Sequence, residues 1–219
     1  MQEYQKTKLN RIKRGQNRAT YDVEKINGIL DAGFIGYVSY NFQGKAIAIP
    51  MAYGRDGNKI ILHGSNANRM LTTLLEAKEM SMTVMHLDAL VLARSGFHHS
   101  VNYRSATLFG SVQKIEDPTK KDAALKCFME HMMKGRWDGI RPMHQKELDR
   151  TLVVEMTIET ASAKIRDVGV QDEPEDYDLD VWAGIVPIKQ VAEYPISDPV
   201  LKESIEIPSH VLDYYHQNK

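Results

Sequence analysis

The chain has 219 residues, of which 42% are hydrophobic, enough for the core of one large domain or two small ones. With 28 Lys and Arg against 29 Asp and Glu, the net charge is -1, so no global positive field attracts nucleic acid or an anionic membrane. The single cysteine, Cys127, cannot form an intrachain disulfide, and no secretory leader or membrane-spanning run is evident. We therefore expect a soluble cytoplasmic protein.

The first part of the chain predicts an arm, a helix and three strands. Residues 1–18 form a basic arm that is either solvated or in contact with an anion or a partner. Helically spaced apolar residues then predict a helix that Asp22 caps and Gly33 ends. Between residues 34 and 64, the sequences NFQGK and GRDGNK have hairpin-turn chemistry and separate three β-rich runs.

The remaining elements complete a mainly β pattern. In chain order, we expect one bent strand or two strands over 81–94, a strand over 105–117, a helix from Asp117 and Pro118, a long strand over 151–168, a last β segment over 181–194 and a helical tail over 199–219. Antiparallel strands outnumber the helices without βαβ alternation. We therefore expect a barrel with helices packed outside, in a single domain of residues 1–219.

Residues 171–180 carry six acidic side chains and a proline in ten positions. This composition predicts a mobile surface loop. The glycine and glutamate spacing of a calcium loop is missing, so we expect no metal site there.

The stretch from Ile60 to Glu79 combines a strand, a polar turn and a helix. Ser65, Asn66 and Asn68 are candidate caps for the helix, whose first turn contains Arg69. A cation there opposes the helix dipole unless an anion binds to the same terminus. Spacing alone leaves a capped turn and a phosphate site both open.

Three segments, AIAIPMAYGRDGNKIILHGSNANRML, NYRSATLFGSV and VWAGIVPIKQV, occur in an informative order and separation. Together they resemble the FMN-binding split β-barrels of the pyridoxamine 5'-phosphate oxidase-like family, which include Nim-type nitroimidazole-resistance proteins. The resemblance extends from about Arg14 to Ile188. It implies a homodimer with FMN at the subunit interface, a small-molecule substrate, and NAD(P)H as a candidate electron donor.

The same resemblance implies specific contacts to FMN. The IPMAY strand would offer backbone groups to the ring, the end of the next strand would reach the ring and ribityl chain, and a basic residue would grip the phosphate. A serine would lie near the flavin, and a tryptophan would come from the second subunit. In chain order, these residues are Ile49, Pro50, Met51, Ala52, His63, Gly64, Ser65, Arg69, Ser105 and Trp182.

Two departures argue against pyridoxamine phosphate oxidation itself. The oxidases carry an Arg-x-His element where this chain reads EYPISDP, and a lysine where it has Tyr53. The segment 86–103 is longer than in the oxidases and would form a lid over the flavin. Within it, His98 and His99 are either loop-surface residues or catalytic candidates that orient a substrate or donate a proton.

We therefore expect an FMN-dependent oxidoreductase that reduces a small electrophilic or aromatic substrate with electrons from NAD(P)H. The flavin would carry the redox chemistry, and the protein would supply binding and orientation. The alternatives are a non-catalytic FMN carrier or redox sensor, and a split barrel that uses the deazaflavin F420 or haem.

Overall fold

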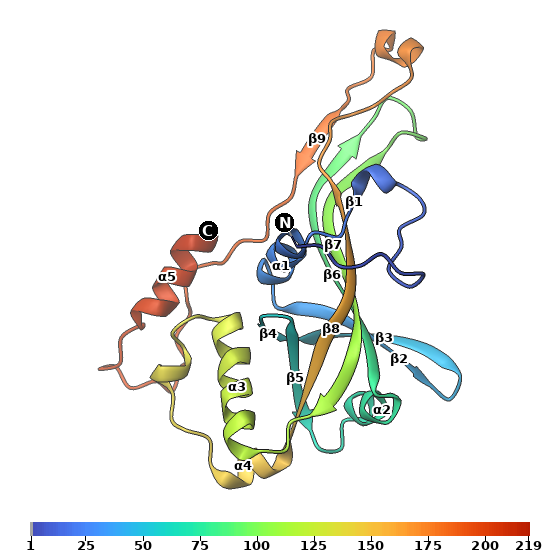
Figure 1. Cartoon of the computed structure of the whole chain (residues 1–219). Helices are drawn as coiled ribbons and strands as arrows, with labels where there is room; N and C mark the ends of the chain where they lie inside the picture. The colour runs from blue at the N-terminus through green and yellow to red at the C-terminus, as the bar shows by residue number, and fades with distance from the viewer. Residues whose placement is uncertain (1) are drawn as a thin grey trace. The chain divides into compact units, whose positions relative to one another are not determined.

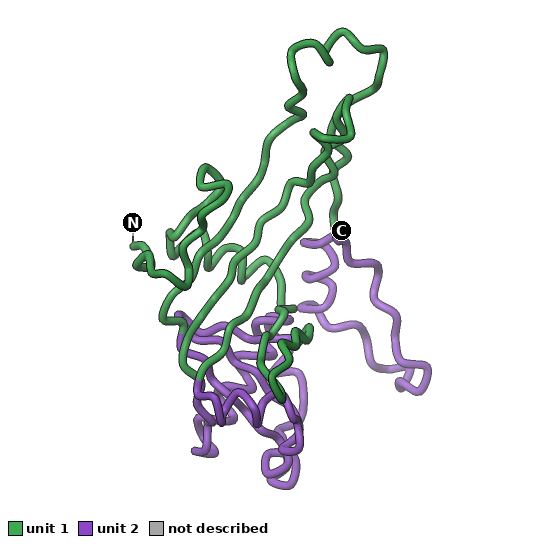
Figure 2. The backbone as a smooth tube through the Cα atoms, turned by 90° about the vertical axis from the view of Figure 1, so that its right-hand side faces the viewer, with its two compact units in different colours: residues 1–51, 79–111, 158–189 green, residues 52–78, 112–157, 190–219 purple. Residues whose placement is uncertain are grey.

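The structure is a computed structural model that describes residues 2–219. The chain divides into two compact units (Figure 2). Unit 1 comprises residues 1–51, 79–111 and 158–189, and unit 2 comprises residues 52–78, 112–157 and 190–219. Three of the five boundaries, those after residues 51, 111 and 157, fall within strands, and the expectation of a single domain stays a prediction.

Most of the regular structure is β, as Figure 1 shows. The strands are β1 (Ala19–Thr20), β2 (Ile35–Phe42), β3 (Lys45–Ala52), β4 (Gly54–Asp56), β5 (Lys59–Ser65), β6 (Glu79–Leu92), β7 (Ser100–Lys114), β8 (Thr151–Arg166) and β9 (Gly184–Pro187). The α-helices are α1 (Val23–Asp31), α2 (Arg69–Ala77), α3 (Pro118–Met132), α4 (Gln145–Arg150) and α5 (Ser209–Asn218). Three 3-10 helices, η1 (Gln16–Arg18), η2 (Trp137–Gly139) and η3 (Pro174–Asp178), complete the described chain.

Antiparallel pairing dominates both units. In unit 1 the strand order is β3-β2-β6-β7, β9 pairs with β6, and β1 pairs with the C-terminal part of β8. In unit 2, β5 lies between β4 and the N-terminal part of β8. The sheet is open, and the mainly β, antiparallel class predicted from the sequence is confirmed.

Helix α1 follows the sequence expectation except at its end. The Asp22 side chain accepts a hydrogen bond from the Lys25 N–H at 2.8 Å, so the predicted cap is confirmed. The helix ends at Asp31 rather than at Gly33. Gly33 serves packing instead, because a Cβ at this position would lie only 2.8 Å from His86 Cε1.

Strand β6 is one bent strand rather than two. Its pairing with β7 shifts register between Leu87 and Ala89, a β-bulge that lets the 14-residue strand bend without ending. Strand β7 begins at Ser100, five residues before the predicted start at Ser105. The turn between β6 and β7 carries His98 and His99.

In unit 2, α3 packs against β4 and β5 (Figure 1). Asp117 caps this helix through a 2.8 Å bond from Lys120 N–H, and Pro118 occupies its first turn, as predicted. The buried cluster beneath it contains Ile61, Ala124, Leu125, Phe128 and Val153.

Two helical details differ from the sequence expectation. Helix α4 was not predicted, because its six residues are too few to show an apolar period. In the tail expected to be helical over 199–219, helix begins only at Ser209, after Pro208.

Candidate functional site

The turn between β5 and α2 is held from several directions. Asn66 donates its backbone N–H to Arg150 O at 3.2 Å and its amide to Asp149 O at 2.7 Å. The Ser65 hydroxyl accepts from Ala67 N–H at 3.2 Å, and Ser65 O accepts from Asn68 N–H at 2.9 Å. These bonds fix the approach of the chain to the N-terminus of α2.

Asn68 is the N-cap of α2, so the structure selects one of the three candidates from the sequence. Its side-chain oxygen accepts from Leu71 N–H at 3.1 Å. A Cβ on Gly64 would lie 3.0 Å from Asn68 Nδ2 and 3.2 Å from Leu71 Cδ1. A side chain at position 64 would therefore require the Asn68 and Leu71 side chains to shift by a few tenths of an ångström.

Arg69 is the first residue of α2 and is exposed, and no acidic residue occupies the first turn. The cap satisfies one N-terminal N–H group, so a capped turn and an anion site are compatible in this geometry. A phosphate at this terminus would complement both the helix dipole and the guanidinium.

His63, one strand position before Gly64, is half-buried against the edge of the Phe128 ring, with the ring centroids 4.4 Å apart. Burial lowers the pKa of His63 below its ordinary value of 6.5. The imidazole is therefore neutral at pH 7 and has one donor and one acceptor nitrogen for a ligand.

In unit 1, Ile49, Pro50 and Met51 lie near the end of β3. The side chains of Ile49 and Met51 are half-buried, and Pro50 between them is exposed. Within the unit, β3 is an edge strand, where the missing N–H of a proline interrupts no ladder between two neighbours. Ala52, the next residue, belongs to unit 2 and packs against the buried cluster under α3.

Ser105 lies on an exposed, largely apolar face of unit 1. It pairs with Met85, and two positions further along β6 Thr83 pairs with Tyr37 of β2, so these side chains project from one face. The large apolar side chains of this face are 38% to 49% exposed, and they are Ile35, Tyr37, Met85 and Leu87. The Ser105 hydroxyl is 3.5 Å from Lys164 O.

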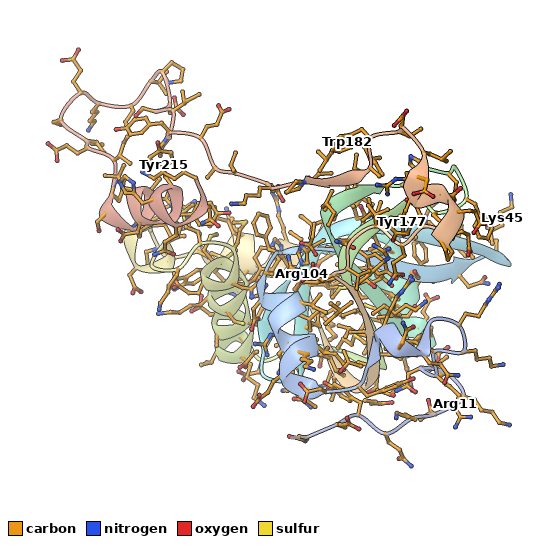
Figure 3. All side chains as sticks on the ribbon, turned by 90° about the horizontal axis from the view of Figure 1, so that it is seen from above. Arg11, Lys45, Arg104, Tyr177, Trp182 and Tyr215 are labelled. Atoms are coloured by element: carbon orange, nitrogen blue, oxygen red, sulfur yellow. The ribbon has the colours of Figure 1, made fainter. Side chains whose placement is uncertain are left out.

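Arg104, which Figure 3 labels, is adjacent to Ser105 and forms an ion pair with Asp88. Its Nε and Nη2 donate to Asp88 at 2.9 to 3.2 Å, and the bond to Asp88 raises the Arg104 pKa. Arg104 would therefore bind a phosphate only if its hydrogen bonds to Asp88 were broken.

Trp182 precedes β9 and is 68% exposed (Figure 3). Its ring lies against Gly184, where a Cβ would come within 2.8 Å of the indole. β9 pairs with β6 from Ala89 to Leu92, so Trp182 is tethered to the strand that carries Met85 and Leu87.

His99 contacts its own loop, and His98 contacts the acidic segment 171–180. His98 Nε2 is 3.4 Å from Glu173 Oε1, and His99 Nδ1 is 2.8 Å from Ser95 O. Nearby, Arg94 binds Asp172. The acidic segment 171–180 thus contacts the β6–β7 turn, and the sequence analysis did not predict these contacts. The opposite charges of the two segments were the feature of the sequence that could have indicated them.

The predicted cofactor contacts divide between the units. Unit 2 brings His63, Gly64, Ser65 and Arg69 together around one turn. Unit 1 places Ser105 opposite Met85 on the exposed face, whereas Trp182 lies beyond the Leu92 end of β6. Ile49, Pro50 and Met51 lie near the end of β3. That all ten contact one flavin stays a prediction.

The model of the family described as pyridoxamine 5'-phosphate oxidase matches residues 22–165, about two thirds of the chain. The chain belongs to the pyridoxamine 5'-phosphate oxidase family. No curated protein matches it significantly.

Solved structures of this family's fold agree with the assignment. The chain is 33% identical to the flavocytochrome Anf3 from Azotobacter vinelandii, with 95% of this chain and 97% of that one covered and a TM-score of 0.90. It is 30% identical to a FAD- and haem-binding protein from Mycobacterium smegmatis, with 90% and 97% covered and a TM-score of 0.86. A proposed 5-nitroimidazole antibiotic resistance protein from Bacteroides thetaiotaomicron shares the fold at 20% identity, with 67% and 86% covered and a TM-score of 0.59. The split-barrel fold predicted from the family resemblance is thereby confirmed.

Residues 2–219 contain neither a helix suited to crossing a membrane nor a group of candidate metal ligands. None of the helices described is both long and apolar enough to cross a membrane. In the same part of the chain, His, Cys, Asp and Glu side chains form no group of three or more that could hold a metal ion.

Proposed function

We propose that this protein binds a flavin nucleotide and acts as a flavin-dependent oxidoreductase on a small electrophilic or aromatic substrate, with NAD(P)H as electron donor. The observation that carries the proposal is the 33% identity to a flavocytochrome over 95% of the chain, in a family to which the chain itself belongs. The flavin would supply the redox chemistry, and the chain would bind and orient it.

The β5–α2 turn fits the phosphate end of such a flavin. An exposed arginine follows the N-cap of a nine-residue helix, and Gly64 keeps the strand close to that cap. FMN and FAD share the phosphate that this turn would hold. The family resemblance favours FMN, and extraction of the bound flavin with acid, followed by chromatography, distinguishes FMN from FAD.

The exposed apolar face of unit 1 supports a homodimer with flavin at the interface. Ile35, Tyr37, Met85 and Leu87 form a contiguous apolar surface, which is typical of an interaction site in a soluble protein. Ser105 adds a hydroxyl to this face, so a flavin edge and a second subunit would both find suitable contacts there.

Haem is a second candidate cofactor, favoured by one half-buried histidine of unit 2 whose Nε2 is buried. In the described chain, His210 Nε2 is buried without a hydrogen-bond partner, and His210 lies beside Gly135 and Gly139. A buried, unpartnered imidazole nitrogen is suited to an axial haem position. Two structures with at least 30% identity are of a flavocytochrome and of a FAD- and haem-binding protein.

The absorbance spectrum of the purified full-length protein tests both cofactors. Flavin absorption that NADH or NADPH bleaches without oxygen is the expected result for the oxidoreductase. A bound flavin that neither nucleotide reduces would leave a carrier or sensor. A colourless protein that takes up neither FMN nor FAD on titration would overturn flavin binding. A Soret band that disappears in His210→Ala would support haem at His210.

A further inference from the structure

Arg166, the last residue of β8, is a buried cation whose bonding partners are neutral. It is 5% exposed, and its Nη1 donates to Asn102 Oδ1 at 2.5 Å and to Val168 O at 3.5 Å. Within residues 2–219 its Nε has no hydrogen-bond partner although it is buried. Buried charges in proteins are normally paired, because an ion that leaves water without a partner loses its hydration free energy and gains no interaction that compensates for it.

The other arginines of this region show the usual solution. Arg94 binds Asp172, and Arg104 forks onto Asp88. None of the ion pairs found among the described residues includes Arg166. The difference singles out Arg166 as a guanidinium that has unused donor capacity for an anion from outside the chain.

Two more cations gather at the same place. Lys164 is two residues before Arg166 on β8, so both side chains leave the same face of the strand. A Cβ added to Gly15 would lie 3.7 Å from Lys164 Nζ and 3.9 Å from Arg18 Cδ, which locates both side chains at one turn of the arm. Burial lowers the pKa of Arg166 and nearby Arg18 lowers it further, while Tyr103 raises it.

The N-terminal arm is anchored where it delivers Arg18. Asn10 donates to Ala161 O at 2.9 Å, and Ile12 N–H donates to the Tyr21 hydroxyl at 3.0 Å. β1 then pairs Ala19 with Lys164. Between these anchors Gly15 adopts φ +67°, a left-handed conformation that turns the chain and favours glycine.

The charged side chains of residues 6–18 are all positive. Residues 6–18 contain no Asp or Glu, and their cations are Lys6, Lys8, Arg11, Lys13, Arg14 and Arg18. Because the whole chain is close to neutral, this concentration of positive charge is local to the arm and the end of β8.

We propose that Arg166, Arg18 and Lys164 form a binding site for the pyrophosphate group of an adenine nucleotide. Pyrophosphate carries several negative charges and many acceptor oxygens. These match three cations that are in none of the ion pairs found among the described residues, and a guanidinium whose Nε has no hydrogen-bond partner. The pyrophosphate belongs either to the adenosine diphosphate half of a bound FAD or to a separate nicotinamide dinucleotide. The site is made of unit 1 residues. Its assignment to a dinucleotide rests on the flavin and NAD(P)H proposed above, whereas binding of inorganic pyrophosphate tests the site itself.

Titration calorimetry of the purified full-length protein with inorganic pyrophosphate and with ADP tests the site. We expect wild type to bind both, Arg166→Gln to bind at least about tenfold more weakly, and Lys164→Gln to be weakened in the same direction. Arg11→Gln removes an exposed cation of the same arm (Figure 3) and should bind as wild type does. Absent binding to wild type, or equal binding to all four proteins, would overturn the proposal.

A melting experiment covers the case in which Arg166 variants fold poorly. Pyrophosphate should raise the melting temperature of wild type, because a ligand that binds only the folded state stabilises it. The rise should be smaller in Arg18→Gln and Lys164→Gln, whose half-buried positions tolerate a polar side chain. An equal rise in these variants and in wild type would contradict the proposal.

Comparison of ADP binding to FMN-loaded and FAD-loaded protein identifies which ligand supplies the pyrophosphate. If the site holds the diphosphate of FAD, FMN-loaded protein binds ADP and FAD-loaded protein does not. If it holds a separate dinucleotide, both loaded forms bind ADP, and NADPH competes. Either pattern supports the site, provided that Arg166→Gln abolishes the ADP binding.

Discussion

Arg94 and Asp172 join the β6–β7 turn to the acidic segment through one carboxylate. The Arg94 backbone N–H lies 3.2 and 3.1 Å from the two Asp172 oxygens, and its Nη1 lies 3.1 Å from Oδ2. The Asp172 side chain has no exposed surface, and the Tyr177 ring covers the Arg94 guanidinium at 4.9 Å. Asp172 is thus the point at which segment 171–180 is attached.

Asp172→Asn should release this segment. The neutral amide loses the charge-assisted attraction to the Arg94 guanidinium and replaces one acceptor oxygen with an NH₂ group, so we expect residues 171–180 to be cleaved by a protease about tenfold faster than in wild type. Glu175→Gln, an exposed acid of the same segment, is the control and should be cleaved at the wild-type rate. Unchanged cleavage of Asp172→Asn would show that the ion pair does not order the segment.

The same carboxylate predicts a pH dependence. Burial raises the Asp172 pKa, but the bonds and charge of Arg94 outweigh burial and hold it below the ordinary value of 3.8. A depressed carboxyl pKa stabilises the folded chain above the ordinary pKa and loses that effect as pH falls through the folded value. The difference in melting temperature between wild type and Asp172→Asn should be constant near neutral pH and shrink below about pH 4. A difference that persists unchanged in acid would exclude Asp172 ionisation as its cause.

Gly54 and Phe128 predict a packing limit in unit 2. A Cβ on Gly54 would lie 2.5 Å from Phe128 Cα, a backbone atom that cannot move alone. Gly54→Ala should therefore destabilise the protein by about 3 kcal/mol, measured by denaturant unfolding. Gly28→Ala is the matched control: nothing lies within 4 Å of its added Cβ, and it should stabilise α1 by about 0.5–1 kcal/mol. Similar effects of the two substitutions would contradict the predicted clash.

Arg69→Ala tests the phosphate end of the proposed flavin site. We expect flavin affinity to fall by about 1.5–3 kcal/mol, roughly 10- to 150-fold, because one charge-assisted fork to phosphate is lost. Fluorescence titration of the flavin-free protein with FMN measures the change. Arg11→Ala removes an equal charge from an exposed position and should leave the affinity as it was. An Arg69→Ala protein that binds FMN as tightly as wild type would remove Arg69 from the site.

Leu87→Glu tests the proposed dimer. Leu87 is 38% exposed on the apolar face with Met85 and Tyr37, and a buried carboxylate at an interface would be opposed by its copy in the partner. Light scattering should give the mass of a dimer for wild type and of a monomer for Leu87→Glu. Leu9→Glu, at an exposed leucine outside this face, should remain dimeric. A monomeric wild type would refute the shared site from the start.

Caps and turns could be predicted because their physics is local. Asp22, Asn68 and Asp117 each bond an N–H three residues away. Residue type and neighbours identified Asp22 and Asp117, and for α2 they left three candidates, from which the structure selects Asn68. The turn between β2 and β3 was predicted on the same local basis, from the residue types in NFQGK. Helix α4 has too few residues for such a signal, and its short length explains why it was missed.

Contacts between distant segments could not be predicted in this way. Arg94 and Asp172 are 78 residues apart, and Asn102 and Arg166 are 64 residues apart. The sequence shows the charges but not their pairing, because partner choice depends on strand register. Both Arg104, which binds Asp88, and Arg166, which binds neutral oxygens, are read identically as arginines on strands.

The sequence by itself determined the β-rich class, the capped helices and the family, since these depend on residue order over short windows and on motifs in series. Only the tertiary structure decided which cations are neutralised within the chain and which retain free donors. Burial and pairing are properties of the folded arrangement, and the free energy of a charge depends on both.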